Sequence, residues 1–181
     1  MNIPNLITIG RILLVPLTIW LLISEEFRLA FLIFILAGIS DGVDGFLARR
    51  WKMQSELGAY LDPLADKALL VSVYAALGLI KVLPAWLVII VVTRDILIVG
   101  GVLLAWLLDK PLAMKPLAIS KVNTAVQIAF AGLVLGVLSA DLNAKPLLLT
   151  GTFIVATLTI LSGAFYMRDW STHMNLDEKK S

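Results

Sequence analysis

Six stretches of about 20 mostly apolar residues follow one another along the chain, and they limit the folds that it can adopt. A helix that crosses a bilayer needs about 20 such residues. Hydrophobic residues make up 60% of the 181 residues, compared with roughly 45–50% in a typical soluble domain. We therefore predict an all-α integral membrane protein with six transmembrane helices. The predicted spans are residues 8–23, 30–49, 60–80, 85–108, 119–139 and 146–167.

The connections between the apolar stretches are short and polar, and prolines border several of them. None is long enough to separate two domains, so we expect one membrane domain over residues 1–181, with a tail from about residue 168. Pro4 and Asn5 are typical of a helix start, and Arg11 follows inside the first apolar run. A short N-terminal interfacial segment is therefore predicted before the first span.

Lysine and arginine are distributed unequally between alternate connections. Most of them lie on the side that also holds both termini and the connection after the second span, whereas the other side holds Arg28, Lys81 and Lys145. Because Lys and Arg are enriched in cytoplasmic loops, the first side is predicted to face the cytoplasm. The expected location is a bacterial-type inner membrane or its organelle equivalent. The net charge of +2 gives no reason to expect a nucleic-acid partner.

Four aspartates lie at the cytoplasmic ends of the second and third predicted spans. Asp41 and Asp44 are three residues apart, and Asp62 and Asp66 are four apart, so each pair lies on one face of its helix. The short connection makes the two helices antiparallel neighbours, and we expect the four carboxylates to converge. Since each ionised group costs at least about 2.5 kcal/mol at the centre of a span, their number indicates a bound cation.

These carboxylates predict a site for two hard cations. The chain contains no cysteine, and oxygen ligands suit Mg²⁺ or Mn²⁺, which bind substrate phosphates. Gly45 and Ala48 lie on the same face and leave room for a nucleotide, while Arg49 offers a planar donor for phosphate. The structural alternatives are close packing of small residues between helices, and ion pairs of the aspartates with nearby Lys and Arg.

The run from Asp41 to Asp66 resembles the signature of the CDP-alcohol phosphatidyltransferases. In that family DxxDGxxAR is followed, after eight residues, by GxxxDxxxD. The fixed positions are all matched here, by Asp41, Asp44, Gly45, Ala48, Arg49, Gly58, Asp62 and Asp66. The resemblance implies the six-helix fold of the family over most of the chain. It also implies transfer of a phosphatidyl or phosphoalcohol group from a CDP-linked donor to an alcohol, with release of CMP.

The resemblance further implies a role for each matched position. Asp41, Asp44 and Asp62 would bind one divalent ion, Mg²⁺ or Mn²⁺, and Asp41, Asp62 and Asp66 would bind a second. Asp66 would also be the general base for the attacking alcohol. The positions implied to bind the CDP part of a CDP-diacylglycerol donor are Pro4, Asn5, Thr8, Gly45, Ala48, Arg49, Ser55 and Gly58. Members of the family are typically homodimers, and a homodimer is expected here.

Candidates for binding the acceptor alcohol lie farther along the chain, at Arg94, Lys115, Lys121 and Asn123. Arg94 lies inside an apolar stretch, where a cation needs a partner, and a cationic acceptor pocket is one interpretation. The alternative is that Arg94 and Asp95 neutralise each other, while the two lysines are ordinary residues flanking a span.

The segment KPLAISKVNTAVQ is similar to the CMP-forming cardiolipin synthases of mitochondrial type, as is the TRD that contains Arg94. The related phosphatidylglycerophosphate synthases usually have KxKT, where this chain has Asn123 in place of the second lysine. Glycerol 3-phosphate carries nearly two negative charges and phosphatidylglycerol carries one. The missing lysine therefore favours phosphatidylglycerol as acceptor and cardiolipin as product, with phosphatidylglycerophosphate synthesis as the alternative.

A small ion-coupled membrane transporter is the competing functional class, because buried carboxylates also couple ions to transport. Such carboxylates lie near the middle of the bilayer. The four aspartates here are predicted beside a basic cytoplasmic connection, which suits a soluble nucleotide leaving group better. The sequence therefore favours the enzyme.

Overall fold

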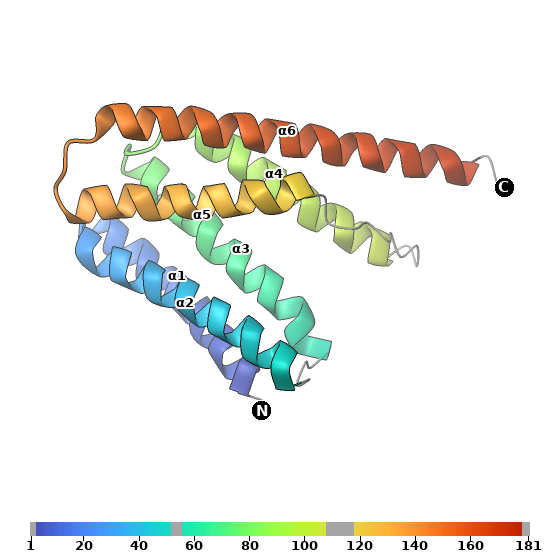
Figure 1. Cartoon of the computed structure of the whole chain (residues 1–181), viewed down its shortest axis with the longest axis horizontal. Coiled ribbons are helices and arrows are strands. Elements are labelled where there is room, and N and C mark those ends of the chain that lie inside the picture. The colour runs from blue at the N-terminus through green and yellow to red at the C-terminus, as the bar shows by residue number, and fades with distance from the viewer. Residues whose placement is uncertain (1–2, 52–55, 108–117, 179–181) are drawn as a thin grey trace. The chain divides into compact units, whose positions relative to one another are not determined.

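The computed structural model describes residues 3–51, 56–107 and 118–178, with side chains at residues 10, 12–40, 67–100 and 118–168. The described residues form six α-helices, without strands, and short turns join α1 to α2, α3 to α4 and α5 to α6. The helices, labelled in Figure 1, are α1 (Ile3–Ile23), α2 (Phe27–Trp51), α3 (Glu56–Leu79), α4 (Ala85–Leu107), α5 (Ala118–Ser139) and α6 (Lys145–Glu178). The all-α prediction is confirmed for these residues.

The ends of α1 and α6 can be compared with the sequence predictions. Helix α1 is continuous from Ile3, in agreement with the helix start predicted at Pro4 and Asn5, and Thr8 belongs to the same helix as the first apolar run. Proline near the first turn is compatible with this, because its missing N–H would have no partner in the helix there. Helix α6 continues to Glu178, so most of the predicted tail is helical. No Gly or Pro follows Gly163 that would end the helix.

Two helices in the part of the chain with described side chains are long and apolar enough to cross a membrane. They are Ala118–Ser139 and Lys145–Arg168. Among the residues with described side chains, α1, α2 and α3 contribute the apolar segments Ile12–Ile23, Phe27–Ser40 and Lys67–Leu79. Membrane association thus has support from length and composition, while the six spans stay a prediction.

The chain divides into two compact units. The first comprises Met1–Ala85 and Ala131–Lys145, and the second comprises Trp86–Phe130 and Pro146–Ser181. In the first unit, α1 packs against both α2 and α3. Buried Leu22, Val73 and Leu77 contribute to its core.

One face of α2 lies along the C-terminal end of α5 within the first unit. A Cβ at Gly132 would lie 3.6 Å from the ring of Phe34, and one at Gly136 would lie 3.6 Å from the ring of Phe31. Farther along, Arg28 Nε donates to the carbonyl of Ser139 at 3.2 Å. This contact satisfies one of the carbonyls left open at the end of α5 and places a cation at the negative end of the helix dipole.

Three helices of the first unit end in the same way. Glu25, Lys81 and Asp141 have φ angles of 60°, 60° and 53°, in the left-handed region usually taken by glycine. At the first of them, the N–H of Glu26 donates to the carbonyl of Leu21 at 2.9 Å, and the N–H of Glu25 donates to the carbonyl of Leu22 at 3.2 Å. The same pair of turn hydrogen bonds recurs after Lys81 and Asp141, as in Schellman caps. These caps account for the short connections.

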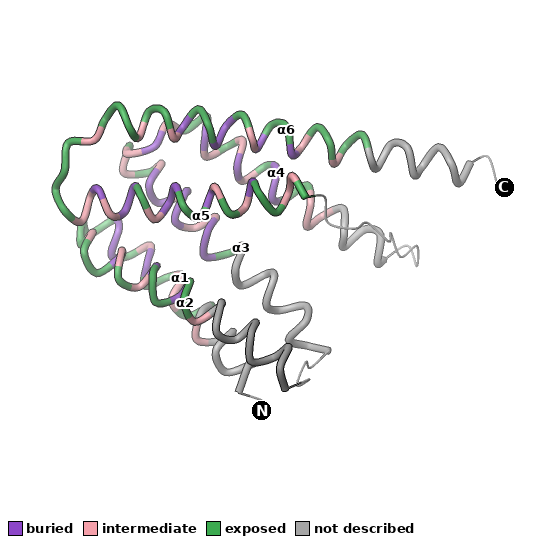
Figure 2. Tube along the Cα trace, in the orientation of Figure 1, coloured by how far each residue is buried: buried purple, intermediate pink, exposed green. Residues whose placement is uncertain are grey.

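The second unit contains one buried stripe along α6. Thr152, Val155, Ala156, Thr159 and Ser162 recur at three- and four-residue spacing and are each at most 5% exposed. In Figure 2, buried and intermediate stretches recur between exposed ones along α6. The stripe carries small and hydroxyl-bearing side chains, which allow close approach of neighbouring helices and hydrogen bonds between them.

Arg94 and Asp95 of α4 form a buried ion pair in the second unit. Arg94 Nη1 lies 2.6 Å from Asp95 Oδ1, and the side chains are 4% and 3% exposed. An isolated charge at this depth would be strongly destabilising. The pair is therefore a condition for the packing of α4.

Gly151→Ala is expected to destabilise the second unit. A Cβ at Gly151 would collide with Cε2 and Cδ2 of the buried Phe130 ring. Overpacking of this kind typically costs about 1–3 kcal/mol, which exceeds the roughly 0.5–1 kcal/mol of helix propensity gained. Thermal unfolding in detergent should report a lower midpoint. Gly38→Ala is the control, since nothing lies within 4 Å of its added Cβ. Equal midpoints for the two variants would contradict this packing.

Asp95→Asn is expected to destabilise the protein by about 3–5 kcal/mol, because it leaves the buried Arg94 without its counter-charge. The double variant Arg94→Met/Asp95→Leu removes both charges and should lose less stability. Thermal unfolding of the purified variants measures the difference. A double variant that is less stable than Asp95→Asn would exclude this account of the pair.

Candidate functional site

The structure places the four aspartates on the predicted helices. Asp41 and Asp44 belong to α2, and Asp62 and Asp66 belong to α3. Helix α2 ends at Trp51 and α3 begins at Glu56, so their ends are less than about 20 Å apart. The aspartate side chains lie outside the described ones. Their convergence therefore stays a prediction.

The other donor-binding candidates, apart from Ser55, fall on α1, α2 and α3. Pro4, Asn5 and Thr8 belong to α1. Gly45, Ala48 and Arg49 belong to α2, and Gly58 belongs to α3. Ser55 lies outside the described residues. Helix α1 packs against both α2 and α3, so one compact unit holds every helix that carries a donor-binding candidate.

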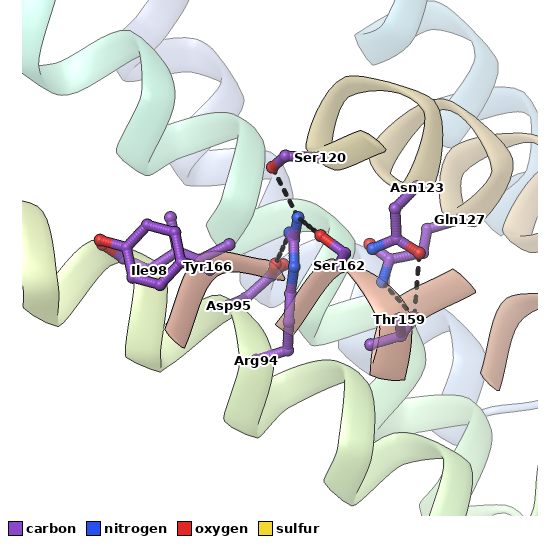
Figure 3. Close-up of polar contacts among 9 residues, drawn as sticks. All are labelled: Arg94, Asp95, Ile98, Ser120, Asn123, Gln127, Thr159, Ser162 and Tyr166. Atoms are coloured by element: carbon purple, nitrogen blue, oxygen red, sulfur yellow. Dashed lines mark hydrogen bonds and ion pairs between the residues drawn. The ribbon is translucent and has the colours of Figure 1, made fainter. Parts of the chain in front are cut away.

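Arg94 connects three helices of the second unit. Its Nη2 donates to Ser120 Oγ of α5 at 2.6 Å and to Ser162 Oγ of α6 at 2.7 Å, while Nη1 donates to Asp95 (Figure 3). The sequence-based alternative of an Arg94–Asp95 pair is thus confirmed as a contact. A guanidinium has five N–H donors, and buried Nε has no hydrogen-bond partner among the described residues.

A second group of hydrogen-bonded polar side chains lies one helical turn from the partners of Arg94 on α5 and α6. Gln127 Nε2 donates to Thr159 Oγ1 at 3.1 Å, and Thr159 Oγ1 donates to Asn123 Oδ1 at 3.1 Å. These three residues, drawn in Figure 3, are fully buried. Asn123 Nδ2 is buried and has no hydrogen-bond partner among the described residues. Ser120 and Asn123 on α5 are three residues apart, as are Thr159 and Ser162 on α6, so the two groups share both helices.

The acceptor-binding candidates therefore divide by environment. Arg94 and Asn123 are buried in the second unit, and Lys121 is exposed on α5. Lys115 lies outside the described residues. The two buried candidates each present one polar N–H group that the described residues do not satisfy. Such groups are rare in protein interiors, which makes this region a candidate for binding a polar ligand.

The sequence did not identify the hydroxyl groups that form hydrogen bonds with Arg94 and Asn123. Ser120, Thr159 and Ser162 bond Arg94 or Asn123. Hydroxyl residues inside apolar stretches were the available signal. It is weak on α6, because a threonine such as Thr152 donates to the carbonyl of Leu148 in its own helix. Only the packing identifies which hydroxyl groups reach another helix.

Comparison with known proteins matches residues 1–165 to the family described as CDP-alcohol phosphatidyltransferase. The human protein named cardiolipin synthase (CMP-forming) is 38% identical over 143 residues, which cover 70% of this chain and 48% of the relative. A Drosophila melanogaster protein named probable cardiolipin synthase (CMP-forming) is 38% identical over 152 residues, covering 75% of this chain and 47% of the relative.

A third relative is similar over nearly its whole length. It is the Bacillus subtilis protein named CDP-diacylglycerol–glycerol-3-phosphate 3-phosphatidyltransferase. It is 30% identical over 186 residues, covering 93% of this chain and 95% of the relative. In contrast, the chain spans about half the length of the human and fly relatives. The family match covers most of the sequence, and it includes all four aspartates. The chain therefore belongs to the CDP-alcohol phosphatidyltransferase family.

Proposed function

We propose that the protein transfers the phosphatidyl group of CDP-diacylglycerol to phosphatidylglycerol, giving cardiolipin and CMP. Family membership supports an enzyme that uses a CDP-linked donor, and supports it over an ion-coupled transporter. The choice of acceptor rests on the environment of Asn123. This neutral amide is fully buried among the neutral side chains of Thr159 and Gln127. A second buried cation there would be costly, whereas an amide suits an acceptor with a single negative charge.

The four aspartates provide the kind of ligands that divalent cations prefer. Asp41, Asp44, Asp62 and Asp66 supply carboxylate oxygens from two helices of one unit, and the chain has no cysteine. We propose Asp41, Asp44 and Asp62 for one ion, and Asp41, Asp62 and Asp66 for a second. Mg²⁺ or Mn²⁺ held there would supply positive charge against the pyrophosphate and the departing CMP.

The remaining steps belong to the chain's own residues. Asp66 is proposed to accept the proton of the acceptor hydroxyl as its oxygen attacks the phosphorus that carries diacylglycerol. A P–O bond forms there, and the bond from this phosphorus to the bridging oxygen of CMP breaks. Arg49 would donate to a phosphate oxygen, and Gly45, Ala48 and Gly58 would leave room for the nucleotide. The other residues proposed to contact CDP are Pro4, Asn5, Thr8 and Ser55.

The acceptor would bind through Arg94, Lys115, Lys121 and Asn123. Burial gives Arg94 and Asn123 fixed orientations, whereas Lys121 is exposed and suits attraction of an anionic headgroup. Phosphatidylglycerophosphate synthesis from glycerol 3-phosphate is the second candidate. It is favoured by the Bacillus subtilis relative, which matches this chain over nearly its full length.

We also propose a homodimer that spans the membrane six times and has its active site at the cytoplasmic face of a bacterial-type inner membrane or an organelle equivalent. Helices α5 and α6 contain segments long and apolar enough for spans. The basic residues near the aspartates support the orientation. A cytoplasmic site would also release the soluble product of the reaction, CMP, into the cytoplasm.

Asp66→Asn is expected to lower CMP release at least about 100-fold while retaining most CDP-diacylglycerol binding, because an amide cannot accept the proton. Asp41 is proposed to bind both ions and Asp66 only one, so Asp41→Asn should weaken Mn²⁺ binding and donor binding more than Asp66→Asn does. Titrations of Mn²⁺ and donor, together with CMP release, separate the two effects. Asp141→Asn is the control, since this aspartate is exposed in a turn. Normal turnover in Asp66→Asn would exclude it as the base.

The purified protein, given CDP-diacylglycerol and Mg²⁺ or Mn²⁺, is expected to make cardiolipin when phosphatidylglycerol is added. Glycerol 3-phosphate should give little product, because the neutral Asn123 stands where phosphatidylglycerophosphate synthases usually have a second lysine. Lipid products are identified by mass spectrometry, with a chelator as the control. Phosphatidylglycerophosphate as the sole product would reject the first acceptor and establish the second.

A further inference from the structure

We propose that Thr159 is a positioning residue that fixes the side-chain amide of Asn123 and thereby sets the affinity for the acceptor. The inference rests on the proposed function, because it assumes that Asn123 contacts the acceptor. Thr159 lies on α6, outside the aspartate signature and outside the candidates identified from sequence.

The hydrogen bonds around Thr159 define the orientation of the amide. A threonine hydroxyl has one proton to donate and can accept others. Thr159 accepts a hydrogen bond from Gln127 Nε2 and gives its own proton to Asn123 Oδ1, each at 3.1 Å. Since Gln127 supplies the donor on one side, the hydroxyl proton is directed to the other. The Asn123 carbonyl oxygen is therefore held toward α6.

Holding the oxygen also directs the rest of the amide. With Oδ1 bonded to Thr159, the NH₂ group of Asn123 must point elsewhere (Figure 3). Asn123 is fully buried, and Nδ2 has no hydrogen-bond partner among the described residues. A buried amide donor is normally satisfied, so this one is suited to an oxygen atom of a ligand. Thr159 presents this donor without contacting the ligand itself.

The neighbouring turn indicates which ligand fits. Arg94 is bonded to Ser120 and Ser162, which lie one turn from Asn123 and Thr159 on the same two helices. Its Nε is a second buried donor without a hydrogen-bond partner among the described residues. Asp95 already balances the charge of Arg94. Two N–H donors with little net charge suit a hydroxyl-rich or singly charged phosphodiester headgroup better than a doubly charged phosphate monoester.

The test compares two buried threonines of α6. Thr159→Val removes the hydroxyl at nearly constant shape, and Thr159→Ser keeps it. Thr152→Val is the matched control, because Thr152 is 4% exposed on the same stripe and donates to the carbonyl of Leu148 within its own helix. Each purified variant is assayed for kcat, for KM of CDP-diacylglycerol and for KM of the acceptor that wild type uses. Thermal unfolding is measured in parallel.

Thr159→Val is expected to raise the acceptor KM about tenfold, with kcat and the donor KM changed less than about twofold, as for loss of one oriented hydrogen bond. Thr159→Ser and Thr152→Val should keep the wild-type acceptor KM. An unchanged acceptor KM in Thr159→Val would overturn the inference. An equal rise in the acceptor KM of Thr152→Val would also overturn it. So would changes in kcat and in both KM values that follow the fall in unfolding temperature.

Asn123→Ala separates this inference from the proposed function. It should raise the acceptor KM as much as Thr159→Val does, and the double variant should raise it no further, since both act through one amide. If Asn123→Ala leaves the acceptor KM unchanged, the proposed acceptor site is wrong. If Asn123→Ala raises the acceptor KM and Thr159→Val does not, the acceptor site stands and the positioning role of Thr159 is wrong.

Discussion

The second unit depends on the ion pair and the hydrogen bonds made by the buried guanidinium of Arg94. A cation in an apolar interior has to be matched by groups on every element around it, and here α4, α5 and α6 each supply one, from Asp95, Ser120 and Ser162. These short contacts fix the rotation of three helices about their axes. The hydrogen bond between Thr159 and Asn123 depends on the same alignment of helices, because these residues lie one turn along α6 and α5 from Ser162 and Ser120.

The two proposed substrates are assigned to different parts of the chain. The aspartates and the other donor candidates fall within Met1–Ala85, whereas Arg94 and Asn123 fall within Trp86–Phe130. A family that keeps one CDP-linked donor chemistry and varies the alcohol can therefore change acceptor residues without altering the helices that carry the aspartates. The name of the human relative specifies cardiolipin as its product and that of the Bacillus subtilis relative specifies glycerol 3-phosphate as its acceptor, which is consistent with such a division.

The sequence predicted the helices well because their signal is the length of each apolar run, and it placed the aspartates on the correct helices through their spacing. It did not predict that α6 continues as a helix to Glu178, since polar residues continue a helix when no breaker intervenes. It identified Arg94 and Asn123 as polar residues in apolar surroundings. Their partners Ser162 and Thr159 could not be identified, because a serine or threonine in a helix can equally bond its own backbone, as Thr152 does.

The left-handed caps at Glu25, Lys81 and Asp141 have a consequence for how deeply the chain sits in a bilayer. Glycine would adopt these angles at lower cost, yet each position carries an exposed charged side chain. In the proposed membrane placement, all three turns lie on the side away from the cytoplasm. None of them can slide into the hydrocarbon without burying its charge. The charged turns would thus fix the depth of the helices in the bilayer. They would thereby also fix the position of the opposite helix ends relative to the membrane surface.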